Sequence, residues 1–285
     1  MRILVIGSGG REHALVWKIR QSPLCTDLIV TPGNGGTQLD GVRSADVKPD
    51  DILGLLKLAR EEKVDLVVPG PELPLVLGIT DAMNVAGIPC FGPDKKAAVI
   101  EASKAFAKDL MQKYNIPTAK YRVFTDAPSA CAYIDAEGAP IVVKADGLAL
   151  GKGVVVAQTV EEAKAAVRSM IEDKAFGQSG TRVVIEEFME GPEVSVLSFT
   201  DGETVVPMVS SMDHKCALDG DKGPNTGGMG AFAPSPLYTE EIAERTEREI
   251  LLPTLHAMNA EGFMFKGVLY VGLMLTAEGP KVVEY

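Results

Sequence analysis

The chain has 285 residues, of which 46% are hydrophobic and 24% charged, a globular composition with room for two or three domains. The net charge of -11 makes nucleic acid or an anionic membrane an unfavourable partner, so we expect neither. No apolar run reaches transmembrane length, and the four cysteines lie far apart without a C-x-x-C pair, which favours reduced thiols in a cytoplasmic protein over a metal cluster.

The first hundred residues alternate short apolar strands with amphipathic helices. We expect strands at 2–6, 28–30, 64–68 and 88–91, and helices from Ala14, over 50–62 and over 75–86. This alternation predicts a doubly wound parallel sheet, in which ligands bind at the carboxyl ends of the strands.

Glycine-rich loops follow three of these strands, at 7–10, 33–36 and 69–72. Glycine loops before helices favour anion binding, because the helix N-terminus presents free N–H groups. We therefore interpret the three loops as one site, with ordinary tight turns as the alternative. The first loop misses the dinucleotide fingerprint, since Glu12 stands at the third glycine and no acid follows the second strand, so a nicotinamide cofactor is disfavoured.

A fourth glycine-rich loop lies between two β-branched runs at 141–143 and 154–156. It carries Gly147, Gly151, Lys152 and Gly153, and Lys144 ends the first run. Glycines and ammonium groups together suit a polyphosphate, and such a hairpin can act as a lid. The alternative is a long hairpin with a solvated lysine.

Lys104 lies in the first turn of a predicted helix, against the helix dipole, so a nearby anion would explain its position. A solvated surface lysine is the alternative.

Farther along, a capping box at 159–162 begins a helix, and the strand 182–188 ends in two adjacent acids. Antiparallel strands are expected at 194–199 and 204–209, a helix at 239–258, and strands at 267–275 and 281–285. The stretch 211–230 is predicted to be a long unstructured loop, either functional or disordered. The histidines have no metal-ligand spacing, and no motif indicates a covalent nucleophile.

Several motifs give the chain a resemblance to ATP-grasp ligases, and more narrowly to the glycinamide ribonucleotide synthetase (phosphoribosylamine–glycine ligase) family. They are V-I-G-S-G-G-R-E-H-A-L (5–15), P-G-N-G-G-T (32–37), G-P-E (70–72), S-K-A-F-A-K (103–108), V-V-K-A-D-G-L-A-L-G-K-G-V (142–154), V-I-E-E-F (184–188), D-H-K (213–215), G-P-N-T-G-G-M-G-A (223–231) and L-Y-V-G-L-M (269–274).

The resemblance implies an α/β fold with an N-terminal parallel-sheet domain (1–102), a linker helix (103–120), an ATP-grasp lid subdomain (121–190) and an ATP-grasp core (191–285). It also implies a ligase of purine biosynthesis that uses ATP with Mg²⁺ or Mn²⁺ to join glycine to 5-phosphoribosylamine through glycyl phosphate. A monomer or weak homodimer is expected.

The resemblance assigns roles residue by residue. For ATP, it implies phosphate contacts by Lys104 and Lys144, a lid of Gly151, Lys152 and Gly153, an adenine hinge of Glu186, Glu187 and Met189 acting largely through backbone groups, and a ribose contact by Glu193. For phosphoribosylamine, it implies Gly9, Gly10, Gly33, Asn34, Gly35, Gly36 and Glu72. For glycine and ribose, it implies Asp213, His214 and Lys215, which we take as catalytic, with Asn225, Thr226, Gly227 and Gly228.

The chain departs from the family pattern in two places. Cys216 stands where the family has arginine, which removes a positive charge beside the substrate. Glu284 matches a metal-binding carboxylate, but the Asn ligand and Arg-Phe-Gly-Asp-Pro-Glu segment that follow in the family are absent after Tyr285. We therefore expect an incomplete chain that is inactive as a ligase yet still binds metal–ATP weakly. Other hypotheses are a different ATP-grasp carboxylate–amine ligase, a nucleotide-binding module without catalysis and, least favoured, a nicotinamide oxidoreductase.

Overall fold

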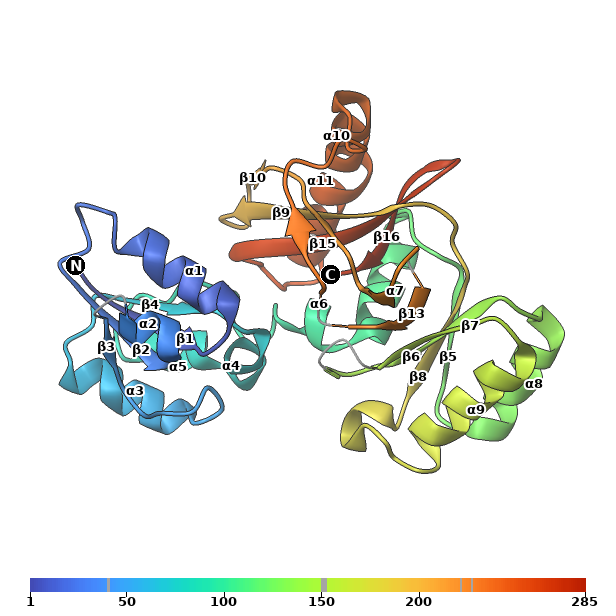
Figure 1. The fold of residues 1–285 in the computed structure, drawn as a ribbon, viewed down its shortest axis with the longest axis horizontal. Helices are drawn as coiled ribbons and strands as arrows, with labels where there is room; N and C mark the ends of the chain where they lie inside the picture. The colour runs from blue at the N-terminus through green and yellow to red at the C-terminus, as the bar shows by residue number, and fades with distance from the viewer. Residues whose placement is uncertain (40–41, 150–152, 221, 227) are drawn as a thin grey trace. The chain divides into compact units, whose positions relative to one another are not determined.

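A computed structural model describes residues 1–39, 42–149, 153–220, 222–226 and 228–285. Gly151, Lys152 and Gly227, three of the predicted site residues, lie outside this set, as does the side chain of Asn225. The chain divides into two compact units (Figure 1): Met1–Val99 with Phe263–Gly267, and Ile100–Gly262 with Val268–Tyr285. Among the described residues, no helix is long and apolar enough to cross a membrane.

The first unit contains the predicted parallel sheet. Its strands are β1 (Arg2–Gly7), β2 (Asp27–Pro32), β3 (Arg43–Ser44) and β4 (Leu66–Pro69), in the order β3-β2-β1-β4, and every pairing is parallel. The strand predicted at 88–91 was wrong, because this segment forms only an isolated bridge between Val67 and Cys90. Gly92, with φ of 150°, and the proline after it turn the chain away from β4.

Helices cover both faces of this sheet. Residues of β1 alternate between the two faces: Ile3 and Val5 pack with Val16 of α1 (Gly10–Ile19), whereas Leu4 and Ile6 pack with α3 (Ile52–Glu61) and α5 (Ile79–Val85). The helix predicted at 75–86 is two helices, α4 (Glu72–Leu77) and α5, because Gly78 between them is left-handed, with φ of 96°. A short helix, α2 (Gly35–Leu39), follows the second glycine loop.

The second unit begins with α6 (Val99–Ala102) and α7 (Lys104–Lys113) and continues into a four-stranded sheet. Its strands are β5 (Tyr121–Phe124), β6 (Ile141–Ala145), β7 (Val154–Ala157) and β8 (Val183–Glu187), paired antiparallel in the order β5-β8-β6-β7. Helices α8 (Ala127–Glu137) and α9 (Val160–Ile171) lie together on one face (Figure 1), where Val143 and Ile185 join their core. Strand alternation therefore places Lys144 and Glu186 on the opposite face.

A second four-stranded sheet has the order β10-β9-β15-β16. Its strands are β9 (Glu193–Thr200), β10 (Val205–Pro207), β15 (Gly267–Thr276) and β16 (Gly279–Glu284), close to their predicted positions. The predicted helix at 239–258 is present as α10 (Glu240–Thr246), a π-helical turn, η2 (Glu247–Leu251), and α11 (Leu252–Ala260). The π-helical turn ends two residues before Pro253, which cannot donate a backbone hydrogen bond.

The prediction of an unstructured loop over 211–230 was wrong for the described residues. Strand β11 (Met212–Asp213) pairs with β14 (Ala231–Phe232), and β12 (Cys216–Leu218) pairs with β13 (Lys222–Asn225), both antiparallel. The stretch has few apolar residues and no alternation, so the sequence carried no strand pattern. Pairing between its two arms fixes the backbone, and it places Asp213, His214 and Lys215 on an ordered hairpin.

Candidate functional site

Two lysines contact one buried carboxylate in the second unit, and a third lysine lies one helical turn away. The Nζ atoms of Lys108 and Lys144 each lie 3.0 Å from Oε2 of Glu186, and the three side chains are between 2% and 4% exposed. Lys104 begins helix α7 one turn before Lys108, and its Nζ donates a hydrogen bond of 3.1 Å to the Gly147 carbonyl. Lys144 also donates to the Val283 carbonyl at 3.0 Å. Two ammonium groups thus share one carboxylate oxygen, while Lys104 lies in the field of Glu284, Asp146 and Glu186.

The start of helix α7 is held by Asp146, the residue after β6. Oδ1 of Asp146 accepts a hydrogen bond of 2.7 Å from the Ala105 backbone N–H, and the Asp146 carbonyl accepts one of 3.1 Å from the Lys104 N–H. Ser103 and Arg182 donate to the same carboxylate. The lysine-bearing helix is therefore fixed directly to the strand that carries Lys144.

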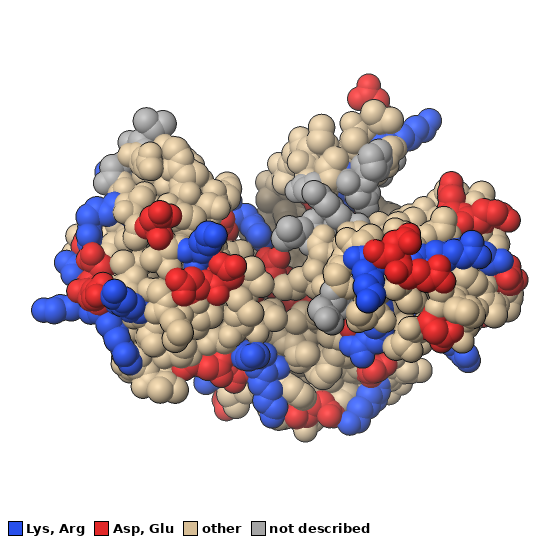
Figure 2. All heavy atoms as spheres, turned by 90° about the horizontal axis from the view of Figure 1, so that it is seen from below, with Lys and Arg blue, Asp and Glu red and all other residues tan. Residues whose placement is uncertain are grey.

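Burial weakens the charge on two of the lysines. Desolvation lowers the pKa of Lys104, although the carboxylate of Glu284 acts in the opposite direction. Desolvation also lowers the pKa of Lys108, to about 8, with Glu186 opposing this effect and the like charge of Lys144 adding to it. An anion placed among these groups would stabilise their protonated forms, so the cluster has the electrostatics of an anion site. By contrast, acidic and basic side chains lie interspersed on the surface drawn in Figure 2.

The glycine-rich hairpin is anchored at both ends of its loop. The Ala145 N–H donates to the Gly153 carbonyl at 2.8 Å, and the Gly147 N–H donates to the Ser179 carbonyl at 3.3 Å. A Cβ at Gly147 would lie 2.5 Å from Ser179 Oγ, and one at Gly153 would collide with Ala149. Glycine is thus required at both positions by close packing, and the backbone carbonyl of Gly147 reaches Lys104 because nothing larger intervenes.

The predicted hinge residues differ in their surroundings. The Glu186 side chain is occupied by lysines at Oε2, while its buried Oε1 has no hydrogen-bond partner among the described residues. Glu187 exchanges hydrogen bonds with Lys120, its Oε1 accepting one of 3.0 Å from the Lys120 N–H. Met189 follows the end of β8 and is half-buried. The end of strand β8 is therefore held by the lysines that contact Glu186 and by the backbone of Lys120, which pairs with Glu187.

Glu193 and Lys215 form an ion pair between β9 and the hairpin. Burial acts to lower the pKa of Lys215, but Glu193 outweighs it and the pKa is raised, so Lys215 stays cationic. Tyr270 lies nearby, with its hydroxyl 3.3 Å from Ser195 Oγ, and burial raises its pKa to about 12. The structure thus joins Glu193, predicted as a ribose contact, to Lys215, predicted as a catalytic residue.

The other two residues of the D-H-K motif lie on the same hairpin. Asp213 ends β11, and the ring of His214 lies 5.7 Å from that of Phe232 between centroids. The N–H of His214 donates to the Gly230 carbonyl at 2.9 Å, and that of Thr226 donates to the Lys215 carbonyl at 2.7 Å. These bonds place the G-P-N-T-G-G-M-G segment against the D-H-K motif.

Glu284, the predicted metal ligand, ends strand β16 opposite Gly272. Its charge acts on Lys104, Lys215 and Tyr270, so it lies near both the lysine cluster and the D-H-K hairpin. Among the residues that the structure describes, no group of three His, Cys, Asp or Glu side chains could hold a metal ion. Mg²⁺ commonly takes few protein ligands and completes its coordination with water and phosphate oxygens.

The first unit brings its three glycine loops to one edge of its sheet. Asn34 donates to the carbonyls of Ser8 and Gly9 at 3.0 and 3.2 Å, and its Oδ1 accepts from the N–H groups of Gly36 and Thr37. The Gly33 N–H donates to the Gly7 carbonyl at 3.0 Å. The loop after β2 is thus bonded to the loop after β1.

Glu12 lies beneath these loops. Its Oε2 accepts a hydrogen bond of 2.6 Å from the Gly9 N–H, whereas its buried Oε1 has no partner among the described residues. A Cβ at Gly70, in the loop after β4, would collide with this carboxylate. Glu72 of the same loop lies 3.8 Å from Arg11, while Gly10 and Gly35 have open space around them. Glu12 therefore fills the place that the third glycine leaves in dinucleotide-binding turns.

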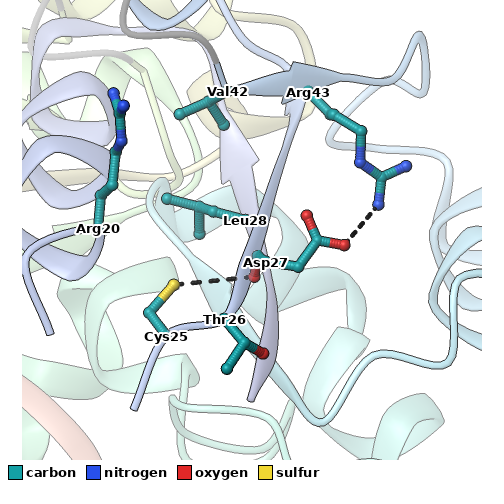
Figure 3. Close-up of a pocket in the computed structure, with 7 residues that line it drawn as sticks. All are labelled: Arg20, Cys25, Thr26, Asp27, Leu28, Val42 and Arg43. Carbon is teal, nitrogen blue, oxygen red and sulfur yellow. Dashed lines mark hydrogen bonds and ion pairs between the residues drawn. The ribbon is translucent and has the colours of Figure 1, made fainter. Parts of the chain in front are cut away.

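One pocket lies elsewhere in this unit, at the amino end of β2, with a volume of about 190 Å³. Figure 3 shows its lining, in which Asp27 is paired with Arg43 and the Cys25 thiol points to the Asp27 carbonyl. None of the predicted site residues lines it. Ligands of parallel sheets bind at the opposite, carboxyl edge, so this pocket is not the candidate site.

Sequence reasoning missed Lys108, Asp146 and Arg182. Lys108 had a signal, because it lies four residues after Lys104 and therefore on the same face of the helix. Asp146 and Arg182 had none, since only the antiparallel pairing of β6 with β8 places them together.

Both halves of the chain match known families. Residues 1–101 match the phosphoribosylglycinamide synthetase N domain, and residues 102–285 match the phosphoribosylglycinamide synthetase ATP-grasp (A) domain. Relatives named phosphoribosylamine–glycine ligase from Xanthomonas campestris and Allochromatium vinosum are 55% and 53% identical over all of this chain, which spans 67% of their length.

Solved structures give the same result for the fold. A phosphoribosylamine–glycine ligase from Thermotoga maritima is 31% identical, with a TM-score of 0.85 over 100% of this chain and 68% of that one. A biotin carboxylase from Campylobacter jejuni, with 15% identity and a TM-score of 0.74, covers 99% of this chain and 64% of that one, and shares the fold alone.

Proposed function

The chain belongs to the phosphoribosylglycinamide synthetase family, and from this premise we propose that it joins glycine to 5-phosphoribosylamine with ATP, giving glycinamide ribonucleotide, ADP and phosphate in de novo purine biosynthesis. One observation carries the proposal: Lys108 and Lys144 share the carboxylate of Glu186, and Lys104 lies near them, bonded to the glycine-rich hairpin. Two buried ammonium groups on one carboxylate leave a positive charge, which a polyphosphate would balance.

The residues present fit ATP. Lys104 and Lys144 would hold its phosphates, with the hairpin at Gly147 and Gly153 close enough for backbone contact. The adenine and ribose would lie along the end of β8, at Glu186, Glu187, Met189 and Glu193. Because Glu193 is paired with Lys215, a ribose hydroxyl that donates to Glu193 would either displace Lys215 or bind beside it.

Glu284 would hold the metal ion together with phosphate oxygens and water, in agreement with the oxygen ligands that Mg²⁺ and Mn²⁺ favour. When bound, the ion would neutralise charge that develops on the transferring phosphoryl group. Its nearness to Lys104 supports this assignment, because a metal ion held by Glu284 would lie close to a phosphate bound to that lysine.

The chemistry has two steps. A glycine carboxylate oxygen attacks the γ-phosphorus of ATP, the bond to ADP breaks, and glycyl phosphate forms. The amine nitrogen of phosphoribosylamine then attacks the acyl carbon, phosphate leaves, and the nitrogen loses a proton. Catalysis comes from positioning and from charge neutralisation by Lys104 and Lys144, so no covalent nucleophile is needed.

Separate parts of the chain would bind the remaining substrates. We assign glycine to the hairpin that carries Asp213, His214 and Lys215, since Lys215 is a partly buried cation suited to a carboxylate. We assign Asn225, Thr226, Gly227 and Gly228 to the binding of glycine and ribose as well. We assign phosphoribosylamine to the glycine loops of the first unit, including Gly9, Gly36 and Glu72, because they lie at the carboxyl edge of the parallel sheet and at the start of helix α1.

The direct test is ADP release by this chain with Mg-ATP, glycine and freshly made phosphoribosylamine, together with mass spectrometry of the product. Release of ADP and glycinamide ribonucleotide in equal amounts, dependent on all three substrates, would support the ligase proposal and refute the expectation from the sequence that this chain is inactive. Release with another amino acid in place of glycine would instead identify a different carboxylate–amine ligase. ATP binding without turnover for any acid would reduce the chain to a nucleotide-binding module and overturn the catalytic proposal.

A further inference from the structure

Lys108 is the most deeply buried member of the lysine cluster. Its side chain is 2% exposed, and its Nζ makes hydrogen bonds of 3.0 Å to Glu186 Oε2 and 2.8 Å to Thr118 Oγ1, with the Ala119 carbonyl at 3.4 Å. Three protein acceptors thus occupy the three N–H donors of its ammonium group, which leaves none for a nucleotide, whereas Lys144 has two such acceptors. Lys108 must therefore act through its neighbours.

Those neighbours form a closed ring. Thr118 Oγ1 donates a hydrogen bond of 2.7 Å to the Val282 carbonyl, and Lys144 donates one of 3.0 Å to the carbonyl of the next residue, Val283. Lys144 also returns to Glu186 Oε2 at 3.0 Å. The ring links helix α7, strands β6 and β8, and strand β16, which ends in Glu284.

Charge balance within the ring decides what Lys144 can do. With both lysines in place, one carboxylate is shared between two ammonium groups and a positive charge remains. Without the charge of Lys108, Glu186 and Lys144 become a neutral pair in a buried environment, where the attraction between opposite charges is strong. Lys144 would then be held by Glu186 and would lose attraction for a phosphate.

We propose that Lys108 is a positioning residue for phosphate binding, which neutralises Glu186 so that Lys144 keeps its charge for the phosphates of ATP. The inference rests on the proposed function in one respect, the identity of the anion as a nucleotide polyphosphate. According to this proposal, Lys108 helps to determine the affinity for ATP although it does not contact the nucleotide.

The test compares Kd values for ATP, ADP and AMP by titration calorimetry in the wild type and in Lys108→Met. We expect about a tenfold or larger loss for ATP and ADP, in the range measured for charged hydrogen bonds, and little change for AMP. Lys113→Met is the matched control, because Lys113 lies on the same helix but its side chain is 62% exposed. An equal loss for all three nucleotides would mean a damaged fold and would overturn the proposal.

A second variant tests the charge balance itself. In Lys108→Met/Glu186→Gln, the carboxylate that captures Lys144 is gone, so ATP affinity should recover most of the loss relative to AMP. A double variant that binds ATP no better than Lys108→Met would contradict the mechanism. Should Lys108→Met fail to fold, the pH profile of Lys108→Arg serves instead.

The pH profile relies on the groups that face Lys108. They are Glu186 and Glu187 of β8, Lys144 of β6 and the ring of Tyr121 of β5, 5.7 Å away. Since burial lowers the pKa of Lys108 to about 8, wild-type ATP affinity should fall as the pH rises through this value, whereas Lys108→Arg should keep its affinity. Identical profiles would refute the proposal. If the wild type does not bind ATP at all, both the proposed function and the role of Lys108 are refuted.

Discussion

Oδ1 of Asp146 accepts a hydrogen bond of 2.7 Å from the backbone N–H of Ala105, which joins the end of strand β6 to the first turn of helix α7. The first N–H groups of a helix have no partner inside it, and here a residue 41 positions away supplies one. Through this bond, the strand that carries Lys144 determines where the helix places Lys104.

Asp146→Ala should therefore destabilise the protein by about 1–3 kcal/mol, because it leaves a buried N–H and Arg182 without their acceptor. Asp146→Asn keeps an oxygen acceptor and should cost less. Asp126→Ala is the control, since Asp126 caps the exposed start of α8 through Ser129 at 2.8 Å and its loss should cost about 1 kcal/mol. Urea denaturation followed by far-UV circular dichroism measures the difference, and equal costs for Asp146→Ala and Asp126→Ala would contradict this role.

Lys104→Met and Lys144→Met should each raise the Kd for ATP about tenfold or more, because each removes a cation from the proposed phosphate site. Equilibrium binding of ATP by calorimetry is the measurement. Lys113→Met removes an exposed cation from the same helix as Lys104 and should leave the Kd within about twofold, as expected for a surface charge. Unchanged affinity for ATP in Lys144→Met would show that the nucleotide phosphates do not bind at this lysine cluster.

Gly36→Ala should raise the KM for phosphoribosylamine without changing the Kd for ATP. A Cβ at Gly36 would collide with the imidazole of His13, so either this ring or the loop bonded to Asn34 must shift. Gly35→Ala is a close control, because nothing lies within 4 Å of a Cβ there. Initial rates at varied phosphoribosylamine concentration distinguish the two, and equal KM values would remove this loop from the substrate site.

Glu284→Gln should weaken ATP binding in the presence of Mg²⁺ and have less effect in its absence, since the charge of the carboxylate is proposed to hold the ion. Titrations with ATP, with Mg²⁺ and with EDTA, measure this difference. Equal losses under both conditions would indicate that Glu284 acts through Lys104 and Lys215 rather than through a metal.

The thiol of Cys90 should react slowly with iodoacetamide at pH 8. Burial raises its pKa to about 11, with the Thr80 hydroxyl opposing the shift, so little thiolate exists at that pH and the rate should keep rising well above pH 9. Thr80→Val removes the opposing hydrogen bond and should slow the reaction further. Site-resolved mass spectrometry over time provides the rates, and a plateau below pH 9 would disprove the shift.

The sequence alone determined much of the fold. Alternating apolar strands and periodic helices predicted the parallel sheet of the first unit, because those patterns follow directly from which faces are buried. The hairpin at Lys144, the antiparallel pair at β9 and β10 and the two closing strands were predicted for the same reason. The residue types in short segments also predicted Lys104 and the glycine loops as anion-binding residues. The order of the motifs along the chain predicted the family to which it belongs.

Only the tertiary structure decided how these residues interact. The hairpins within 211–230 escaped prediction because polar strands have no hydrophobic pattern, and their pairing depends on the partner arm. Lys108 and Glu186 meet across 78 positions and Asp146 and Arg182 across 36, through the pairing of β6 with β8 and the packing of α7. A charge in a sequence has no fixed environment. Burial beside a particular partner sets its pKa and its ligand, and burial exists only once the chain is folded.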